Sequence, residues 1–232
     1  MSQSSTQARA LSRYAQALAG RRFLLLFLFL LFDLVLYPYI DHPGFHYYGF
    51  RVLGSAVILL SVYAVSSRRS LIVFALLLAT PALLHRIVFL PLHASVLSIF
   101  STLLAFVFNV FIAIVIFRHI FGHKRSSSET IFGALCVYLL IGFSFASLFE
   151  IVAALQPGAF YLDPLTNLRK IPDRFDCVYY SFGTMSALGA SGITPVSNQA
   201  RSLTVIEALL GILYLAVLIS RLMASYRVRE DD

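Results

Sequence analysis

The amino-acid sequence predicts an all-α membrane protein with six transmembrane helices and one further segment that enters the membrane without crossing it. Hydrophobic residues make up 59% of the chain and charged residues 12%, and the mean hydropathy is +0.83. This composition excludes an ordinary soluble domain. A helix needs about 20 mostly apolar residues to cross a bilayer. The segments that meet this requirement are 23–41, 48–67, 70–91, 94–118, 130–155 and 202–224.

The first span follows a polar N-terminal arm, residues 1–20, and the pair Arg21-Arg22. An arginine pair before an apolar run is also typical of a signal peptide, but no A-x-A-like cleavage site follows. We therefore interpret this segment as an uncleaved first span. Short turns join spans one to four, so residues 21–118 are expected to form an antiparallel four-helix bundle.

Most basic residues outside the long loop between spans five and six fall on one side of the predicted membrane. They are Arg9, Arg13, Arg21, Arg22, Arg68, Arg69, Arg118, Lys124, Arg125, Arg221, Arg227 and Arg229. Short loops rich in Lys and Arg stay in the cytoplasm, so both termini are expected there. The asymmetry, together with attraction of a basic linker at 119–129 to anionic lipid headgroups, accounts for the net charge of +7 without a nucleic-acid partner.

The segment between spans five and six is too broken to cross the membrane. It begins with a turn-rich turret, residues 156–172, and continues with Asp173 and Asp176, which suit the first turn of a short helix at 173–186. Glycine-containing chain follows at 187–192. Irregular backbone at membrane depth is tolerated only where protein buries it or where it lines water. The order of these segments is therefore the signature of a pore loop.

The residues from Asp176 to Pro195 follow the pattern D-x-x-Y-Y-S-F-x-T-x-x-x-x-G-x-x-x-I-T-P, and ARSLTVIEALLGILYLAVLISRLM comes next. This run resembles the pore loop and inner helix of bacterial six-transmembrane members of the potassium channel superfamily. Residues 130–155 resemble the outer helix, 202–224 the inner helix, and 225–232 remain as a cytoplasmic tail. The resemblance implies a pore domain at 130–224, a homotetramer and a bacterial plasma membrane. The first four spans resemble a voltage-sensor-like bundle in layout alone.

In that family the selectivity filter typically reads T-V-G-Y-G-D. The aligned residues here are Ala187, Leu188, Gly189, Ala190, Ser191 and Gly192. Potassium filters replace the hydration shell of the ion with rings of backbone carbonyls, and glycine lets these carbonyls turn inward. A left-handed residue other than glycine, as Ser191 would be, costs about 1–2 kcal/mol. The hydroxyl, the aromatic ring and the acid of the usual filter are missing at 187, 190 and 192.

We therefore predict a potassium-channel-like cation channel with weakened or altered selectivity, with K⁺ and possibly Na⁺ as permeant ions and no other cofactor. The negative C-terminal end of the pore helix favours a cation. Two alternatives stay open: an ordinary potassium filter with tolerated substitutions, and a non-conducting channel relative that acts as a membrane scaffold or sensor. An enzyme is not expected, since G-x-S-x-G, H-E-x-x-H and paired intramembrane aspartates are absent from the sequence.

Charges in the first four spans suggest little voltage sensing. Span four has one basic residue, Arg118, at its cytoplasmic end, whereas a voltage sensor needs repeated arginines within the bilayer. Asp33 lies near the middle of span one, and Arg51 or Arg86 is its expected ion-pair partner. A proton or ion relay through Asp33 is the alternative.

The remaining candidate residues belong to the pore domain or to the outer turns. Those expected on the pore helix are Tyr179, Tyr180, Thr184 and Ser186. The resemblance implies that Glu150 and Glu207 brace the filter, with a protonation-controlled gate as the alternative. Gly211 could be a hinge or a close-packing residue. Three leucines of span six could form a hydrophobic gate or could simply pack against span five, and they are Leu215, Leu218 and Leu222. The outer histidines could bind zinc or lie at the interface without a metal, and they are His42, His46 and His93.

Overall fold

The computed structural model describes residues 22–36, 61, 73, 95–122, 128–167, 170–189 and 192–227. Helices dominate this part of the chain, and two short strands interrupt them. In chain order the elements are α2 Arg22–Leu36, α5 Ser95–Gly122, α6 Ser128–Leu155, β1 Phe160–Leu162, α7 Arg174–Met185, β2 Ile193–Pro195 and α8 Asn198–Arg227.

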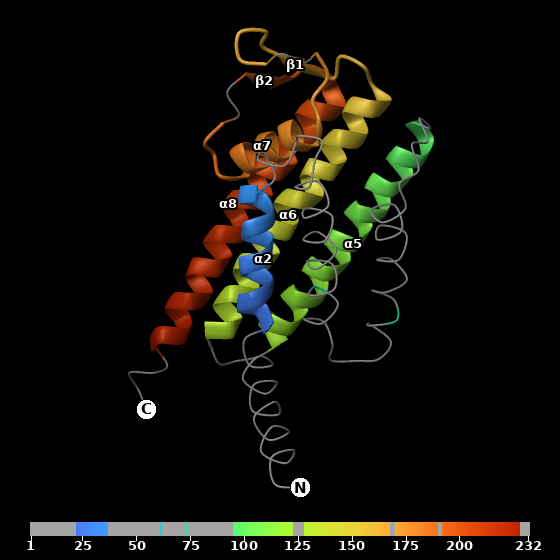
Figure 1. Ribbon diagram of the computed structural model, residues 1–232. Coiled ribbons are helices and arrows are strands. Elements are labelled where there is room, and N and C mark those ends of the chain that lie inside the picture. The colour runs from blue at the N-terminus through green and yellow to red at the C-terminus, as the bar shows by residue number, and fades with distance from the viewer. Residues whose placement is uncertain are drawn as a thin grey trace, which may run out of the picture.

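Four of the helices run alongside one another, and α6 lies at the centre of the arrangement (Figure 1). It contacts α2, α5, α7 and α8. The shorter α7 lies against α6 and α8, close to the end of the molecule where β1 pairs with β2. A short helix therefore sits between two long helices, with a small sheet above it.

Three helices of the described part are long and apolar enough to cross a membrane. Their apolar stretches are Ser98–Gly122, Glu129–Leu155 and Asn198–Arg221, and they correspond to the fourth, fifth and sixth predicted spans. Helix α2 overlaps the first predicted span and begins one residue before it. The predicted spans 48–67 and 70–91 lie outside the described residues except for Ser61 and Val73, so the count of six stays a prediction.

The helix ends differ from the predicted boundaries. Helix α5 continues to Gly122 and takes in the first residues of the predicted linker 119–129. Helix α8 begins at Asn198 and ends at Arg227, beyond both predicted ends of the inner helix. Its early start has a local cause, because the Ser197 hydroxyl accepts a hydrogen bond from the Ala200 amide at 3.2 Å and caps the first turn.

Two hydrophobic clusters hold these elements together. The first joins α2, α5 and α6 through buried side chains that include Leu26, Ile112 and Leu140. The second joins α6, β1 and α7, where the rings of Phe149, Phe160 and Tyr180 meet edge to face with centroids 5.0–5.7 Å apart. Such ring pairs stabilise by about 0.5–1.5 kcal/mol beyond the burial of their area. The second cluster therefore fastens α7 and β1 to the same end of α6.

Polar contacts join helix ends at the opposite end of the molecule. The Glu129 carboxylate on α6 accepts a hydrogen bond from the Phe23 amide in the first turn of α2 at 3.1 Å. Arg221 on α8 donates to the Ile120 carbonyl in the last turn of α5 at 2.5 Å. An acid at a helix N-terminus and a cation at a C-terminus both complement the helix dipole. Each of these two side chains thus caps a neighbouring helix.

We expect Phe149→Ala to lower the free energy of unfolding by about 2–5 kcal/mol, because it removes a fully buried ring that contacts both β1 and α7. Thermal unfolding of the purified protein in detergent measures the effect. Leu165→Ala is the control, since Leu165 is 93% exposed and should leave the unfolding temperature unchanged. Equal unfolding temperatures for both variants would contradict the packing described here.

Candidate functional site

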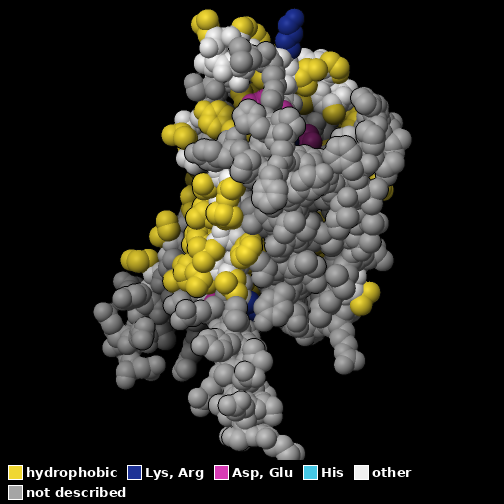
Figure 2. Space-filling view, viewed as in Figure 1, with side chains coloured by type: hydrophobic (Ala, Val, Ile, Leu, Met, Phe, Trp, Pro, Cys, Tyr) yellow, Lys and Arg dark blue, Asp and Glu magenta, His cyan; other side chains and the backbone are white. Residues whose placement is uncertain are grey.

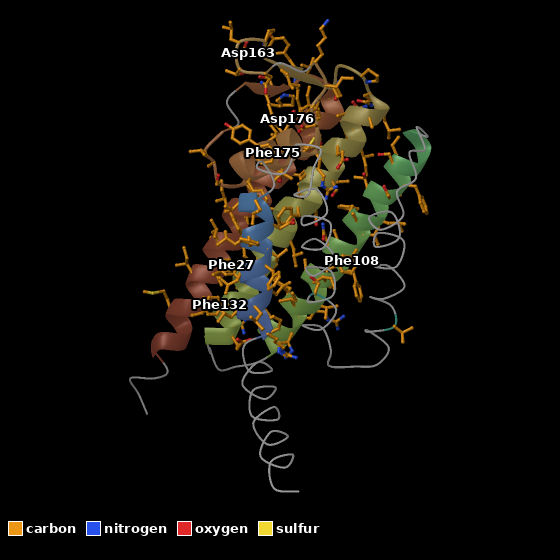
Figure 3. All side chains as sticks on the ribbon, in the orientation of Figure 1. Phe27, Phe108, Phe132, Asp163, Phe175 and Asp176 are labelled. Atoms are coloured by element: carbon orange, nitrogen blue, oxygen red, sulfur yellow. The ribbon has the colours of Figure 1, made fainter. Side chains whose placement is uncertain are left out.

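The predicted pore-helix segment 173–186 contains α7 and its two cap residues. Asp173 is the N-cap, and its side chain accepts a hydrogen bond from the Asp176 amide at 2.7 Å. The Asp176 side chain in turn accepts one from the Asp173 amide at 2.9 Å. This reciprocal capping box fixes where the helix begins. Figure 3 shows Asp176 and Phe175 at this end of α7, below Asp163 of the turret.

One face of α7 packs closely against α6 because Gly142 has no side chain. A β carbon at Gly142 would lie 2.7 Å from the ring of Phe182, too close for a real contact. Phe182 also packs edge to face on Phe143. The glycine therefore lets the Phe182 ring lie directly on the α6 backbone.

Hydrogen bonds tie the other side of α7 to α8. The hydroxyls of Tyr180 and Thr204 lie 2.8 Å apart. Ser181 Oγ lies 2.7 Å from the Gly142 carbonyl oxygen of α6 and 2.5 Å from Glu207 Oε1 of α8. Ser181 is thus the point at which α6, α7 and α8 share one buried polar contact.

Glu207 is fully buried, and its second oxygen, Oε2, has no hydrogen-bond partner in the described part of the protein. The Ser181 hydroxyl has a single proton to donate, and the Gly142 carbonyl can only accept. Both short contacts are hydrogen bonds only when Glu207 carries a proton and donates it to Ser181. A neutral acid also avoids the large cost of an isolated buried charge.

Glu150 has a different environment. It forms an ion pair with Arg174, the first residue of α7, at 3.3 Å, and both side chains are partly exposed. Exposed pairs of this kind stabilise by about 0–1 kcal/mol. Both predicted brace residues therefore reach α7 itself, Glu150 at its first residue and Glu207 halfway along it. Their action on the filter stays a prediction.

The chain leaves α7 through left-handed steps. Ser186 is the C-cap, and its hydroxyl donates to the Phe182 carbonyl at 2.6 Å. Ala187 follows with φ of 58° and Gly189 with φ of 81°. The Gly189 amide donates to the Gly183 carbonyl at 2.9 Å, which holds the turn against the helix end. Leu188, between the two left-handed residues, is 80% exposed.

The sequence pointed to left-handed strain at Ser191, but Ser191 and Ala190 lie outside the described residues. The structure instead has a left-handed residue other than glycine at Ala187, which costs about 1–2 kcal/mol. Strain in the predicted filter therefore begins directly after the cap of α7. Of the other predicted pore-helix residues, Tyr179 is exposed and Thr184 is half-buried.

After positions 190 and 191, Gly192 leads into β2, which pairs with β1 in an antiparallel sheet. The register places Phe160 opposite Pro195, Tyr161 opposite Thr194 and Leu162 opposite Ile193. This sheet was not predicted. Its only local signal is that both three-residue strands are rich in aromatic and β-branched residues.

Gly211 lies against the last residue of α7. A β carbon there would be 2.5 Å from the Met185 carbonyl oxygen and 2.6 Å from Met185 Cγ. This contact favours the close-packing interpretation of Gly211. Leu218 packs against the first hydrophobic cluster and Leu215 is exposed, whereas the side chain of Leu222 lies outside the described residues.

Most of the surface of α8 is apolar and uncovered in a single chain. Figure 2 shows hydrophobic side chains gathered in a band over α2, and more of them at the left edge of the view, where α8 lies. The exposed large side chains on α8 are Val205, Ile206, Leu209, Leu210, Ile212, Leu213, Leu215, Val217, Ile219 and Met223. A face of this size needs lipid or protein against it.

Together, α6, the capped α7, the left-handed turn and the uncovered α8 form one continuous unit. Residues 133–227 match the family model described as Ion channel. The match starts in α6 and ends with the last residue of α8, so it contains α7 and the predicted filter. It supports an ion-channel family and a channel-like, ion-conducting function. No curated protein matches the chain.

Several other predicted residues lie outside the described part of the protein. They are Arg51, Arg86, His42, His46 and His93. Asp33 lies on α2, but its predicted pairing with an arginine of spans two or three is untested. Within the described ranges, no group of three His, Cys, Asp or Glu side chains could hold a metal ion. Cys136 and Cys177 are both buried and free.

We expect Gly211→Ala to destabilise the channel by about 1–3 kcal/mol, because the added methyl group meets the Met185 backbone. Gly122→Ala is the matched control, since a β carbon at Gly122 meets nothing within 4 Å. Thermal unfolding in detergent compares the two variants. A Gly211→Ala channel as stable as the control would rule out a tight contact and favour a hinge.

We expect Glu207→Ala to lower the free energy of unfolding by about 2–4 kcal/mol, because it leaves a cavity and removes the partner of Ser181. Glu207→Gln should recover most of the loss, since its amide can donate to Ser181 as a neutral acid does. Glu150→Gln is the control and should change stability by less than about 1 kcal/mol. A large loss in Glu207→Gln would mean that Glu207 is charged in the folded protein.

Proposed function

We propose that the protein is a homotetrameric cation channel related to the potassium channels, with weakened or altered ion selectivity. The observation that supports this proposal most directly is the packing of α7 between α6 and α8 within the residues that match the ion-channel family. A capped re-entrant helix that ends in left-handed chain is the arrangement that brings backbone carbonyls to an ion path.

The presence of a single pore loop in each copy supports the proposal of four copies. A single chain has one pore loop, and a central path for ions needs several such loops around one axis. The uncovered apolar side chains of α8 would then face α8 and α7 of neighbouring subunits and the central cavity. Lipid would cover the outward side of the bundle.

The selectivity proposal rests on the residues that replace the usual filter. Ala187 has no hydroxyl to offer an ion at the inner end, and it is held in a strained left-handed conformation. The C-terminal end of the α7 dipole still favours a cation over an anion. We therefore propose a cation path whose carbonyls are less well placed to replace the hydration shell of K⁺.

Voltage sensing through α5 is not part of the proposal. This helix has one arginine, Arg118, near its C-terminus and neither lysine nor another arginine along the rest of its length. Movement of α5 through the membrane field would carry little charge. We also propose that the remaining predicted spans complete a six-span subunit in the plasma membrane, with both termini in the cytoplasm.

We expect the purified protein in planar bilayers, with K⁺ on one side and Na⁺ on the other, to show a current that reverses near zero potential. A reversal near the potassium equilibrium potential would mean that the altered filter still builds selective potassium sites. A tetrameric sample without current would instead favour a non-conducting scaffold or sensor. Lipid bilayers without protein are the control.

A further inference from the structure

We infer that the turret segment 163–167 holds the outer end of the filter in place, and that Asn167 and Thr166 are positioning residues for ion selectivity. The selectivity part of this inference rests on the proposed channel function. The physical contact between turret and filter is independent of that function.

The Gly192 carbonyl, at the outer end of the predicted filter, accepts two hydrogen bonds from the turret. The Asp163 amide donates one at 2.9 Å, and Asn167 Nδ2 donates the other at 3.0 Å. Both acceptor positions of this carbonyl are therefore used by the turret. A carbonyl held by two donors cannot turn freely toward an ion path.

The donors are themselves held in place by a compact turn. The amides of Thr166 and Asn167 both donate to the Asp163 carbonyl, at 3.0 and 2.8 Å, and the Leu165 amide donates to the Asp163 carboxylate. Asn167 Nδ2 also donates to Thr166 Oγ1 at 3.1 Å. The side chain of Asn167 is thus oriented before it meets Gly192, which lowers the entropy cost of the contact.

The turn is anchored to the protein core through β1. Phe160 of β1 is 5% exposed and packs on Phe149 and Tyr180 in the second hydrophobic cluster. Directly after β2, the amides of Val196 and Ser197 donate to the Ala159 carbonyl, which precedes β1, at 2.8 and 3.2 Å. The position of Gly192 is therefore set by α6 and α7 through the turret, and not by the filter alone.

Gly192 also shows that turret and filter are shaped to fit each other. Its φ of 84° is one that glycine adopts readily. A β carbon at this position would collide with Thr166 Oγ1 and lie 3.0 Å from Asn167 Nδ2. The acid that stands here in the related filters has no room beside this turret. The glycine at 192 therefore leaves the space that the side chains of Thr166 and Asn167 occupy.

A filter carbonyl that moves outward binds a dehydrated ion less well, so release of this contact should change ion preference. Asn167→Asp tests the idea directly, because it keeps the size of the side chain, removes both donors and places a carboxylate beside the Gly192 carbonyl. The matched control is Asn198→Asp. Asn198 is exposed at the first position of α8, on the same side of the molecule, and receives the same added charge.

The first measurement is the K⁺ to Na⁺ permeability ratio from reversal potentials in bilayers. We expect Asn167→Asp to change the ratio by roughly twofold or more and Asn198→Asp to leave it unchanged. A folded Asn167→Asp channel with the wild-type ratio would overturn the inference. A change of equal size in both variants would assign the effect to surface charge and would also overturn it.

The second measurement needs no ion current, so it separates this inference from the proposed function. Gly192→Ala should lower the unfolding temperature, and adding Thr166→Gly should recover about half of that loss, because it removes the hydroxyl that the new methyl group meets. Losses that simply add would show that turret and filter are not in contact. If the wild-type protein carries no current but the recovery is seen, the channel proposal fails and the turret contact stands.

Discussion

The arrangement of the pore region depends on the buried contact of Ser181 with Gly142 and Glu207. This serine lies on the short helix, the carbonyl belongs to the outer helix and the acid to the inner helix, so one hydroxyl sets the distance between all three. Buried polar groups are costly unless their partners are well placed. The two glycines that face α7, Gly142 and Gly211, then allow the backbones to approach closely enough for this contact to form.

Aromatic packing and the turret extend this order to the end of the molecule that carries the sheet. Phe149, Phe160 and Tyr180 join α6, β1 and α7 near the place where Asp173 and Asp176 begin the helix. The sheet and the Gly192 contact then hold the chain on the far side of the filter. The predicted filter is consequently fastened at both ends, by the α7 cap at one and by the turret at the other.

The helices of the pore region could be predicted because their signals are local: long apolar runs for α6 and α8, and paired acids for the start of α7. The contacts between them could not. Hydropathy does not specify how a helix is rotated, so Glu150 and Glu207 were indistinguishable in the sequence, although Glu150 is paired at the surface and Glu207 is buried against Ser181. The β1–β2 pairing joins three-residue segments far apart in the chain, and such short segments have no pattern of their own. A left-handed residue at Ala187 follows directly from the end of α7, whereas the strain expected at Ser191 stays a prediction because Ser191 lies outside the described residues.

Cross-capping at the opposite end has a mechanical consequence for the inner helix. Arg221 supplies the hydrogen bond that the last turn of α5 lacks, and its guanidinium also lies 4.3 Å from the centre of the Phe121 ring. An outward swing of α8 would leave the Ile120 carbonyl without this donor, at a cost of about 1–3 kcal/mol. Arg221 therefore couples α8 to the last turn of α5, and a displacement of either helix would strain its contact with the other.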